Sequence, residues 1–209
     1  MEQPKEIRPP RQKRSQETLD SLLNATIRVL DDDGLDAATI PRIAGLAGVA
    51  PASVYRRFVN KDALIRAALL SMLHGSRSEA LVVPDGETLP DTARRLMRLL
   101  FQQYRQHPRL LRALSRYLDA DGDAQFIAEA RAAVAGNLAL LAGPLLAHRE
   151  QIGHADPEAA LRFALLQALT SIEAIALEPY SLWHIALAGT DEELGERFAE
   201  AFVAYLAKR

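Results

Sequence analysis

Two short helical segments joined by a glycine turn constrain the fold of this chain more than any other part of its sequence. They lie within residues 39–64, which read TIPRIAGLAGVAPASVYRRFVNKDAL. The apolar spacing predicts helices over 40–47 and 51–58, with Thr39 as the N-cap of the first and a turn at Gly48. Helices of this length are unstable alone in water, so the pair must pack on a third helix. The sequence therefore predicts a three-helix unit of the helix-turn-helix type.

The preceding segment supplies that third helix, which we expect over residues 15–32. Its apolar side chains recur at the spacing of one helix face: Leu19, Leu22, Leu23, Thr26, Ile27 and Leu30. Ser15 is the expected N-cap, and Gly34 is expected to end the helix in a left-handed conformation. Residues 1–14 contain three prolines and five Lys or Arg, which predicts a flexible basic arm.

Composition narrows the fold class and the possible chemistry. Helix formers dominate and aromatic residues make up 6% of the chain, so we expect an all-α protein. The absence of cysteine excludes disulfides, thiolate metal sites and cysteine nucleophiles. There is no secretory signal and no uninterrupted apolar run of the ~18 residues that span a membrane, so we expect a cytoplasmic protein without membrane contact. No catalytic or metal-binding motif is recognisable, so we expect neither enzyme activity nor a cofactor or metal.

The distribution of charge leaves two interpretations open. The chain carries a net charge of -2, but residues 1–66 hold eleven Lys or Arg against nine Asp or Glu. Cations gather at both ends of this segment, which is compatible with contacts to nucleic acid. A solvated surface of mixed charge explains the same pattern equally well.

The outer surface predicted for the second short helix is suited to double-stranded DNA. Pro51, Ala52 and Ser53 are small, which lets a helix N-terminus lie deep in a major groove. Tyr55, Arg56 and Lys61 follow, and such side chains commonly bind phosphates.

These residues resemble the signature of the TetR/AcrR family of transcriptional regulators. The matching positions, in the spacing of the family, are Thr39, Ile43–Ala44, Ala47–Gly48–Val49, Tyr55, Phe58, Lys61 and Leu64. The resemblance extends over roughly residues 15–70. Three features depart from the family pattern, because Ala50 replaces a capping Ser or Thr, Pro41 is unusual, and Arg57 stands where an aromatic residue is common. Arg57 either adds a phosphate contact or lies over the helix.

The resemblance implies roles for individual residues. Thr39, Tyr55 and Lys61 correspond to family residues that contact phosphates. The positions that face bases in relatives are Arg42, Pro51, Ala52 and Ser53. The basic arm, including Lys13 and Arg14, corresponds to arms that enter an adjacent minor groove.

Residues 67–209 predict further helices and contain no motif of their own. We expect the helices to cover residues 61–77, 92–106, 108–120, 123 into the 140s with a kink or break at Gly143–Pro144, 157–177 and 190 to the C-terminus. The resemblance implies that this part binds an effector and forms a homodimer. The expected organisation is therefore an arm (1–14), a DNA-binding domain (15–66) and an effector and dimerisation domain (67–209).

The resemblance implies that the dimer interface lies on the last two long helices. The helix predicted over 157–177 is apolar on nearly all sides, so most of its faces must be covered. A partner subunit would cover one side, although a central helix in a monomeric bundle has the same composition. The expected interface residues are Leu161, Leu165, Leu169, Ile172, Phe198 and Phe202.

Aromatic and polar residues of the same domain are candidates for an effector pocket. They are Phe101, Tyr104, Tyr117, Phe163, Gln167 and Trp183, although core packing explains each of them, taken singly, better than ligand binding does. Such a lining predicts a small, largely apolar effector. The sequence thus predicts a ligand-responsive repressor that binds a palindromic operator as a dimer. The alternatives are a helical carrier or enzyme with a structural N-terminal unit, and a regulator switched by another protein or acting through non-specific DNA binding.

Overall fold

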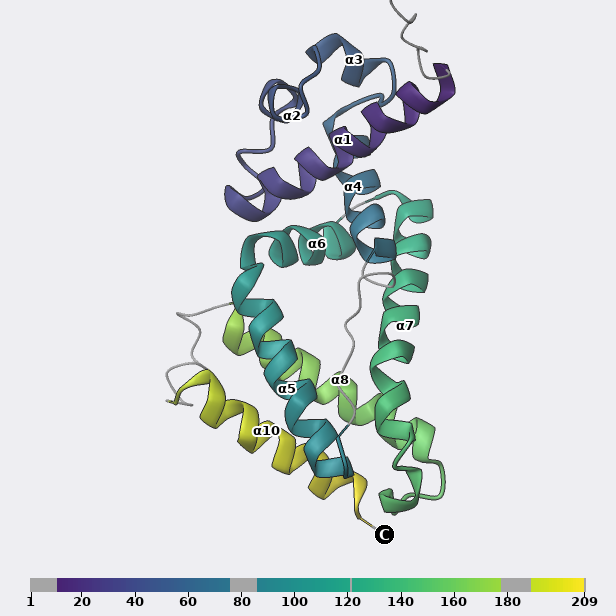
Figure 1. Cartoon of the computed structure of the whole chain (residues 1–209), viewed down its shortest axis with the longest axis vertical. Coiled ribbons are helices and arrows are strands. Elements are labelled where there is room, and N and C mark those ends of the chain that lie inside the picture. The colour runs from purple at the N-terminus through teal and green to yellow at the C-terminus, as the bar shows by residue number, and fades with distance from the viewer. Residues whose placement is uncertain (1–10, 76–85, 121, 178–188, 209) are drawn as a thin grey trace, which may run out of the picture. The chain divides into compact units, whose positions relative to one another are not determined.

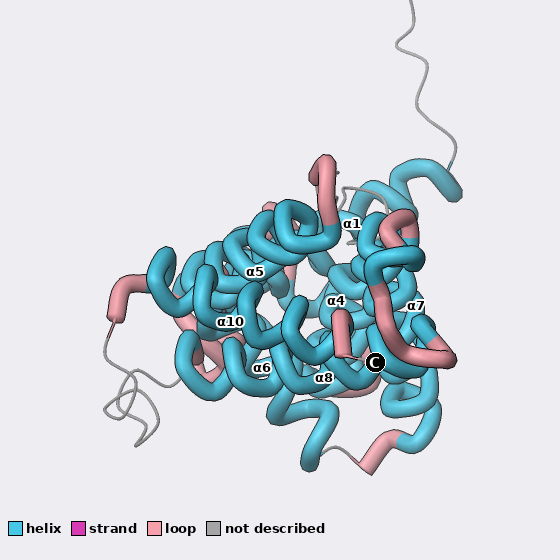
Figure 2. Tube along the Cα trace, turned by 90° about the horizontal axis from the view of Figure 1, so that it is seen from below, coloured by secondary structure: helices cyan, strands magenta, loops and turns pink. Residues whose placement is uncertain are grey.

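The computed structural model describes residues 11–75, 86–120, 122–177 and 189–208. Within these ranges the chain forms helices and loops without a strand, which confirms the predicted all-α class (Figure 2). The chain divides into two compact units, Met1–Ser71 and Met72–Arg209. The boundary lies inside a helix, five residues beyond the predicted boundary at 66.

The first unit is the predicted helix-turn-helix. Its helices are α1 (Arg11–Asp32), α2 (Ile40–Leu46), α3 (Pro51–Tyr55) and the first part of α4 (Lys61–Gly75). In Figure 1, α2 and α3 lie along the same side of α1. The core joins all four helices through side chains that are fully buried: Leu22, Leu30, Ile43, Val54, Leu64 and Ile65.

Local signals explain most of the boundaries in this unit. The Thr39 side chain accepts a hydrogen bond from Arg42 N, which confirms the predicted cap of α2. Gly34 and Gly48 have φ of 85° and 69°, the left-handed region where glycine avoids the steric cost of a side chain. Asn60 Oδ1 accepts from Ala63 N at the start of α4, as expected for an N-cap.

Two boundaries in this unit differ from the prediction. Helix α1 begins at Arg11, so Ser15 is not its cap, and Lys13 and Arg14 belong to a helix rather than to an arm. Residues 11–32 contain neither Gly nor Pro, and nothing in that stretch opposes the helix. Helix α3 ends at Tyr55, three residues before the predicted end.

The second unit consists of longer helices. They are α5 (Leu89–Gln106), α6 (Pro108–Ala120), α7 (Ala124–Leu146), α8 (Pro157–Ala176) and α10 (Asp191–Leu206), with a short 3-10 turn η1 (Arg149–Gln151). Asp123 and Asp156 are the N-caps of α7 and α8, and the side chain of each accepts a backbone N–H. Thr190 and Glu193 form a capping box at the start of α10.

Two differences from the prediction in this unit lie at prolines. Helix α5 starts at Leu89 instead of 92, because Pro90 lies in the first turn, where its missing N–H has no intrahelical partner. Helix α7 continues through Gly143 and Pro144 to Leu146, so the helix is not broken there.

Helix α5 lies in the middle of the second unit and contacts α6, α7, α8 and α10. Its buried face meets α8 and α10, as Figure 1 shows. The largest fully buried side chains in this core are Leu89, Leu96, Met97, Leu145, Leu161 and Leu165. The core therefore uses part of the apolar surface of α8 that the sequence analysis assigned to a partner.

Two of the described helices, α7 and α8, are long and apolar enough on average to cross a membrane. The sequence analysis found no such run because it counted uninterrupted apolar residues. Core helices satisfy the same criterion, and α8 contributes Leu161, Leu165 and Ile172 to the core of its own unit. Its apolarity is therefore explained by packing.

The C-terminal end of α10 is held by the segment before α8, which leads to a first prediction. Gly153 N donates to Leu206 O at 2.8 Å, and His154 Nε2 donates to Tyr205 O at 2.7 Å. A Cβ at Gly153 would lie 2.8 Å from the backbone oxygens of Ala207 and Lys208. We expect Gly153→Ala to lower the free energy of unfolding by about 1–3 kcal/mol, because the backbone must move apart.

Urea unfolding of the full chain measures this effect. Gly143→Ala is the matched control, because a Cβ there meets nothing within 4 Å. Because Gly143 lies inside a helix, Gly143→Ala should instead raise the free energy of unfolding by about 0.5–1 kcal/mol. Equal stability of the two variants would contradict the proposed backbone contact.

Candidate nucleic-acid interface

Helix α3 exposes one face and anchors itself by the other. Val54 is fully buried, whereas Pro51, Ala52 and Arg56 are exposed. Tyr55 retains 61% of its surface. A side chain of this size is rarely left so open in a packed unit, so it is available to a partner.

The remaining predicted phosphate-binding residues flank α3. Thr39 caps α2 and is exposed, and Lys61 is the first residue of α4 and is half-buried. Lys13 and Arg14 are exposed in the first turn of α1. The first unit thus carries every predicted DNA-binding side chain.

Arg42, predicted to face bases, is engaged within the protein. Its Nη2 donates to Asp33 Oδ2, and both side chains are partly open to solvent. An ion pair this exposed contributes little to the stability of the folded protein. A negatively charged or acceptor-rich partner can therefore replace Asp33 at small cost.

Two arginines are tethered by serines on either side of α3. Arg56 Nη2 donates to Ser53 Oγ at 2.9 Å. Arg57 Nη2 donates to Ser15 O at 2.8 Å and to Ser15 Oγ at 3.0 Å. Arg57 thus joins the segment that follows α3 to α1, a contact between residues 42 positions apart that sequence analysis did not anticipate.

These residues surround a hollow of about 450 Å³. Its lining comprises Ser15, Thr18, Val49, Ala50, Ser53, Arg56 and Arg57. Two further exposed side chains of this unit, Val59 at 88% and Leu46, are apolar and were also not anticipated. Apolar side chains of this kind can contact thymine methyl groups.

The residues predicted to line an effector pocket do not come together in the described part of the second unit. Phe101 is buried, with its ring centroid 5.9 Å from that of Phe198. Tyr117 meets Phe126 edge-on at 6.2 Å. Phe163 and Gln167 are exposed on α8, and Trp183 lies outside the described residues. Phe101 and Tyr117 are therefore core residues, the alternative that the sequence left open.

Three polar groups stand out in this largely apolar unit. Ser115 Oγ donates to Glu173 Oε1 at 2.9 Å. Burial, followed by the nearby negative charge of Glu173, raises the pKa of Tyr104 to about 12, so the phenol stays protonated. Asn137 Nδ2 donates to Leu73 O at 3.1 Å, while its buried Oδ1 has no partner among the described residues.

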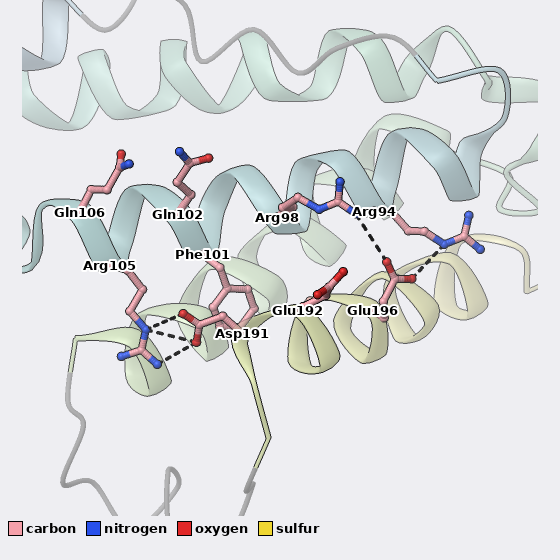
Figure 3. A pocket seen from close by; sticks show the side chains of 10 residues that line it. Arg94, Arg98, Phe101, Gln102, Arg105, Gln106, Asp191, Glu192 and Glu196 are labelled. Carbon is pink, nitrogen blue, oxygen red and sulfur yellow. Dashed lines mark hydrogen bonds and ion pairs between the residues drawn. The ribbon is translucent and has the colours of Figure 1, made fainter.

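A charged cleft of about 480 Å³ lies between α5 and α10 (Figure 3). Arg105 binds Asp191 with both ends of its guanidinium and also donates to Ala176 O at 3.2 Å. Arg94 Nε is 3.0 Å from Glu196 Oε2. These pairs tie α10 to α5, so the cleft is suited to holding helices together and not to an apolar effector.

The exposed apolar surface of α8 differs from the predicted interface. Leu161, Leu165 and Ile172 are buried inside their own unit, which corrects their assignment to a dimer interface. Phe163 and Leu166 are instead exposed, at 46% and 59%. Beside them, a groove of about 210 Å³ runs between α8 and α10, lined by Ala164, Gln167, Ala168, Ser171, Phe198, Ala201, Phe202 and Tyr205. Of the predicted set, Phe198 and Leu169 are half-buried, and Phe202 lines this groove but is itself buried in the core of the unit.

Within the described residues, no three His, Asp or Glu side chains are grouped so that they could hold a metal ion.

Comparison with known proteins places the first unit among bacterial regulators. The family described as "Bacterial regulatory proteins, tetR family" matches residues 22–68. An uncharacterized HTH-type transcriptional regulator of Mycobacterium tuberculosis is 36% identical over 93 residues, 44% of each chain. The HTH-type nicotine-responsive transcriptional repressor HdnoR of Paenarthrobacter nicotinovorans is 37% identical over 83 residues, 39% of this chain and 43% of the repressor. The match thus spans less than half the length of these relatives.

Solved structures resemble the fold over nearly the whole chain. A putative TetR-family transcriptional regulator from Mesorhizobium loti has a TM-score of 0.70 at 22% identity and covers 93% of this chain and 97% of its own. The regulator FadR from Bacillus subtilis was solved in complex with stearoyl-CoA. It has a TM-score of 0.63 at 17% identity, and the likeness covers 91% of this chain and 99% of the FadR chain. At this identity the likeness establishes the fold alone.

Proposed function

Through residues 22–68 this chain belongs to the TetR family of bacterial regulatory proteins, and on this premise we propose that it is a ligand-responsive repressor. It binds a palindromic operator as a homodimer in the cytoplasm and releases the DNA when a small molecule binds the second unit. The observation that carries the proposal is the exposed face of α3, where Tyr55 and small residues project from a rigidly packed core.

On the DNA, α3 lies in the major groove. Pro51, Ala52 and Ser53 face base edges, since their small side chains allow close approach. Tyr55 and Lys61 bind phosphates on either side of the groove, and these contacts set the register of the helix.

Dimerisation supplies the twofold symmetry that a palindromic operator requires. The surface that supports it is the exposed apolar face of α8 with Phe163 and Leu166, beside the groove to α10. The small side chains in that groove allow helices of a second copy to approach closely.

The effector is small and largely apolar, with at least one hydrogen-bond donor. The apolar character follows from the helices of the second unit, and the donor follows from the acceptor Asn137 Oδ1, which is buried without a partner among the described residues. Binding shifts α4, which carries the boundary between the two units. By linkage, operator DNA then weakens effector binding by the same factor, about 1–3 kcal/mol.

A fluorescence anisotropy titration tests the function. The purified protein is titrated against DNA from immediately upstream of its own coding region and against the same DNA scrambled. We expect a preference of about a hundredfold or more, with two protomers per site. Equal, salt-sensitive binding to both would instead favour a non-specific role, and no binding at low salt would favour a carrier or an enzyme.

Substitutions in the first unit separate phosphate from base contacts. Tyr55→Ala and Lys61→Ala should each cost about 1 kcal/mol per protomer, or about 30-fold per dimer, on every DNA sequence. Ser53→Ala should instead change the ratio of affinities between operator variants, because a base contact discriminates by about 1–3 kcal/mol. Titrations against a set of single-base operator variants distinguish the two patterns. The assignment of roles fails if all three variants lose affinity equally on every sequence.

A further inference from the structure

We infer that the second unit binds a protonated organic amine, whose ammonium group pairs with the carboxylate of Glu173. This inference rests on the proposed function and gives the chemical class of its effector. Three side chains from three helices carry it: Tyr104 on α5, Ser115 on α6 and Glu173 on α8. All three are half-buried.

Glu173 is a carboxylate that its own unit does not neutralise. Ser115 Oγ donates to its Oε1 at 2.9 Å, and this contact brings no charge. Among the described residues, no Lys, Arg or His forms an ion pair with Glu173. A charge that is partly removed from water is costly unless an opposite charge accompanies it. A cation is therefore the ligand that this carboxylate favours.

The position of Glu173 along its helix increases this cost. Glu173 lies in the last turn of α8, which ends at Ala176. The backbone carbonyl groups give a helix C-terminus a partial negative charge, which disfavours a carboxylate and favours a cation. A bound ammonium group would offset both the unpaired charge and the unfavourable helix end.

The arginine that reaches this end of α8 is already paired with another carboxylate. Arg105 Nε lies 2.9 Å from Asp191 Oδ2, and Arg105 Nη2 lies 2.9 Å from Asp191 Oδ1. Its Nη1 donates to Ala176 O, a backbone oxygen in the same last turn as Glu173. Arg105 thus caps the helix while its charge is balanced by Asp191, and Glu173 keeps its need for a cation.

Tyr104 makes the site suitable for an organic cation. Burial, followed by the charge of Glu173, raises the pKa of its phenol to about 12, so Tyr104 adds no second negative charge. Its ring packs against the apolar core of the unit. Aromatic faces attract organic cations, and the surrounding apolar side chains suit the hydrocarbon part of an amine. A divalent metal ion would require more oxygen ligands, and no such group occurs among the described residues.

A second polar group of the same unit also requires a donor. Asn137 Oδ1 on α7 is buried without a partner among the described residues, whereas its Nδ2 donates to Leu73 O. An ammonium group contributes N–H donors and no acceptor, as the lysine side chain does. An alcohol also donates but leaves Glu173 unpaired, and a carboxylate would repel it. An amine is therefore the class that meets both requirements.

Calorimetric titration of the full chain with matched ligands, in the absence of DNA, tests the inference. The probes are n-hexylamine, n-hexanol and hexanoate, with phenethylamine, phenethyl alcohol and hydrocinnamate as a bulkier set. At neutral pH the alkyl amines are protonated, as a lysine side chain is. We expect each amine to bind about 10- to 100-fold more tightly than its alcohol, the range for a hydrogen bond to a charged group. The carboxylates should bind more weakly than the alcohols.

Substitution of Glu173 assigns the preference to this side chain. Glu173→Gln removes the charge at nearly constant shape and should abolish the preference for amine over alcohol. Glu173→Asp keeps the charge and should keep the preference, which separates loss of charge from disturbed packing. The matched control is Glu158→Gln, which removes an exposed carboxylate at the other end of α8 and should bind the amines as wild type does.

Three results would overturn the inference. They are equal affinity of wild type for amine and alcohol, an amine preference that survives in Glu173→Gln, and no amine binding in either set. Failure of the proposed function is a different result, because it appears as wild type without a preference for operator DNA. Amine binding through Glu173 that leaves operator affinity unchanged would uphold the amine site and contradict the ligand-responsive function.

Discussion

Replacing Leu166 by glutamate is expected to convert the proposed dimer into a monomer and to abolish specific operator binding. Leu166 is 59% exposed on α8, and Phe163 lies one turn away on the same exposed face. In a twofold interface the substitution places two buried carboxylates near each other without partners, which is strongly unfavourable. A monomer contacts one half-site only, so the affinity for the full operator collapses.

Light scattering after size-exclusion chromatography measures the mass, and anisotropy measures operator affinity. Leu140→Glu is the matched control, because Leu140 is an equally large apolar residue, 50% exposed on α7. We expect this control to remain dimeric and to bind the operator. A dimeric Leu166→Glu variant with full affinity would place the interface elsewhere.

The second large effect is expected from Leu161→Ala. Leu161 is 1% exposed and packs in the core shared by α5, α8 and α10, so truncation leaves a cavity. We expect the free energy of unfolding to fall by about 2–5 kcal/mol. Chemical denaturation at several protein concentrations measures it.

The concentration series separates the two faces of α8. A core defect should lower stability by the same amount at every concentration. Leu166→Ala should instead act mainly through the dimer, so its effect should depend on protein concentration. If Leu161→Ala behaved like Leu166→Ala, the correction of the interface from Leu161 to the outer face would be wrong.

Features that depend on neighbouring residues could be predicted from the sequence. The cap at Thr39 is an interaction within four residues and occurs as expected, and the caps at Asp123, Asp156 and Thr190 are of the same local kind. The DNA-binding candidates from Thr39 to Lys61 form one continuous stretch of about two dozen residues. Their spacing is set by local helix geometry, so the pattern alone located the unit.

Features that depend on distant residues could not be predicted. Arg57 and Ser15 are 42 positions apart, and Arg105 and Asp191 are 86 positions apart. No periodicity relates such pairs, because only the packing of helices brings them together. The sequence analysis accordingly left the role of Arg57 open between two alternatives.

The sequence by itself determined that the chain is helical, where most helices begin, and which segment carries the DNA-binding unit. Only the tertiary structure decided which side of α8 is core and which side is surface. Helix α8 has leucine or phenylalanine on both sides, so its composition distinguishes no face. Packing against α5 and α10 covers Leu161 and Leu165 and leaves Phe163 and Leu166 open. Burial is a property of what surrounds a side chain, and those surroundings come from other helices far away in the sequence.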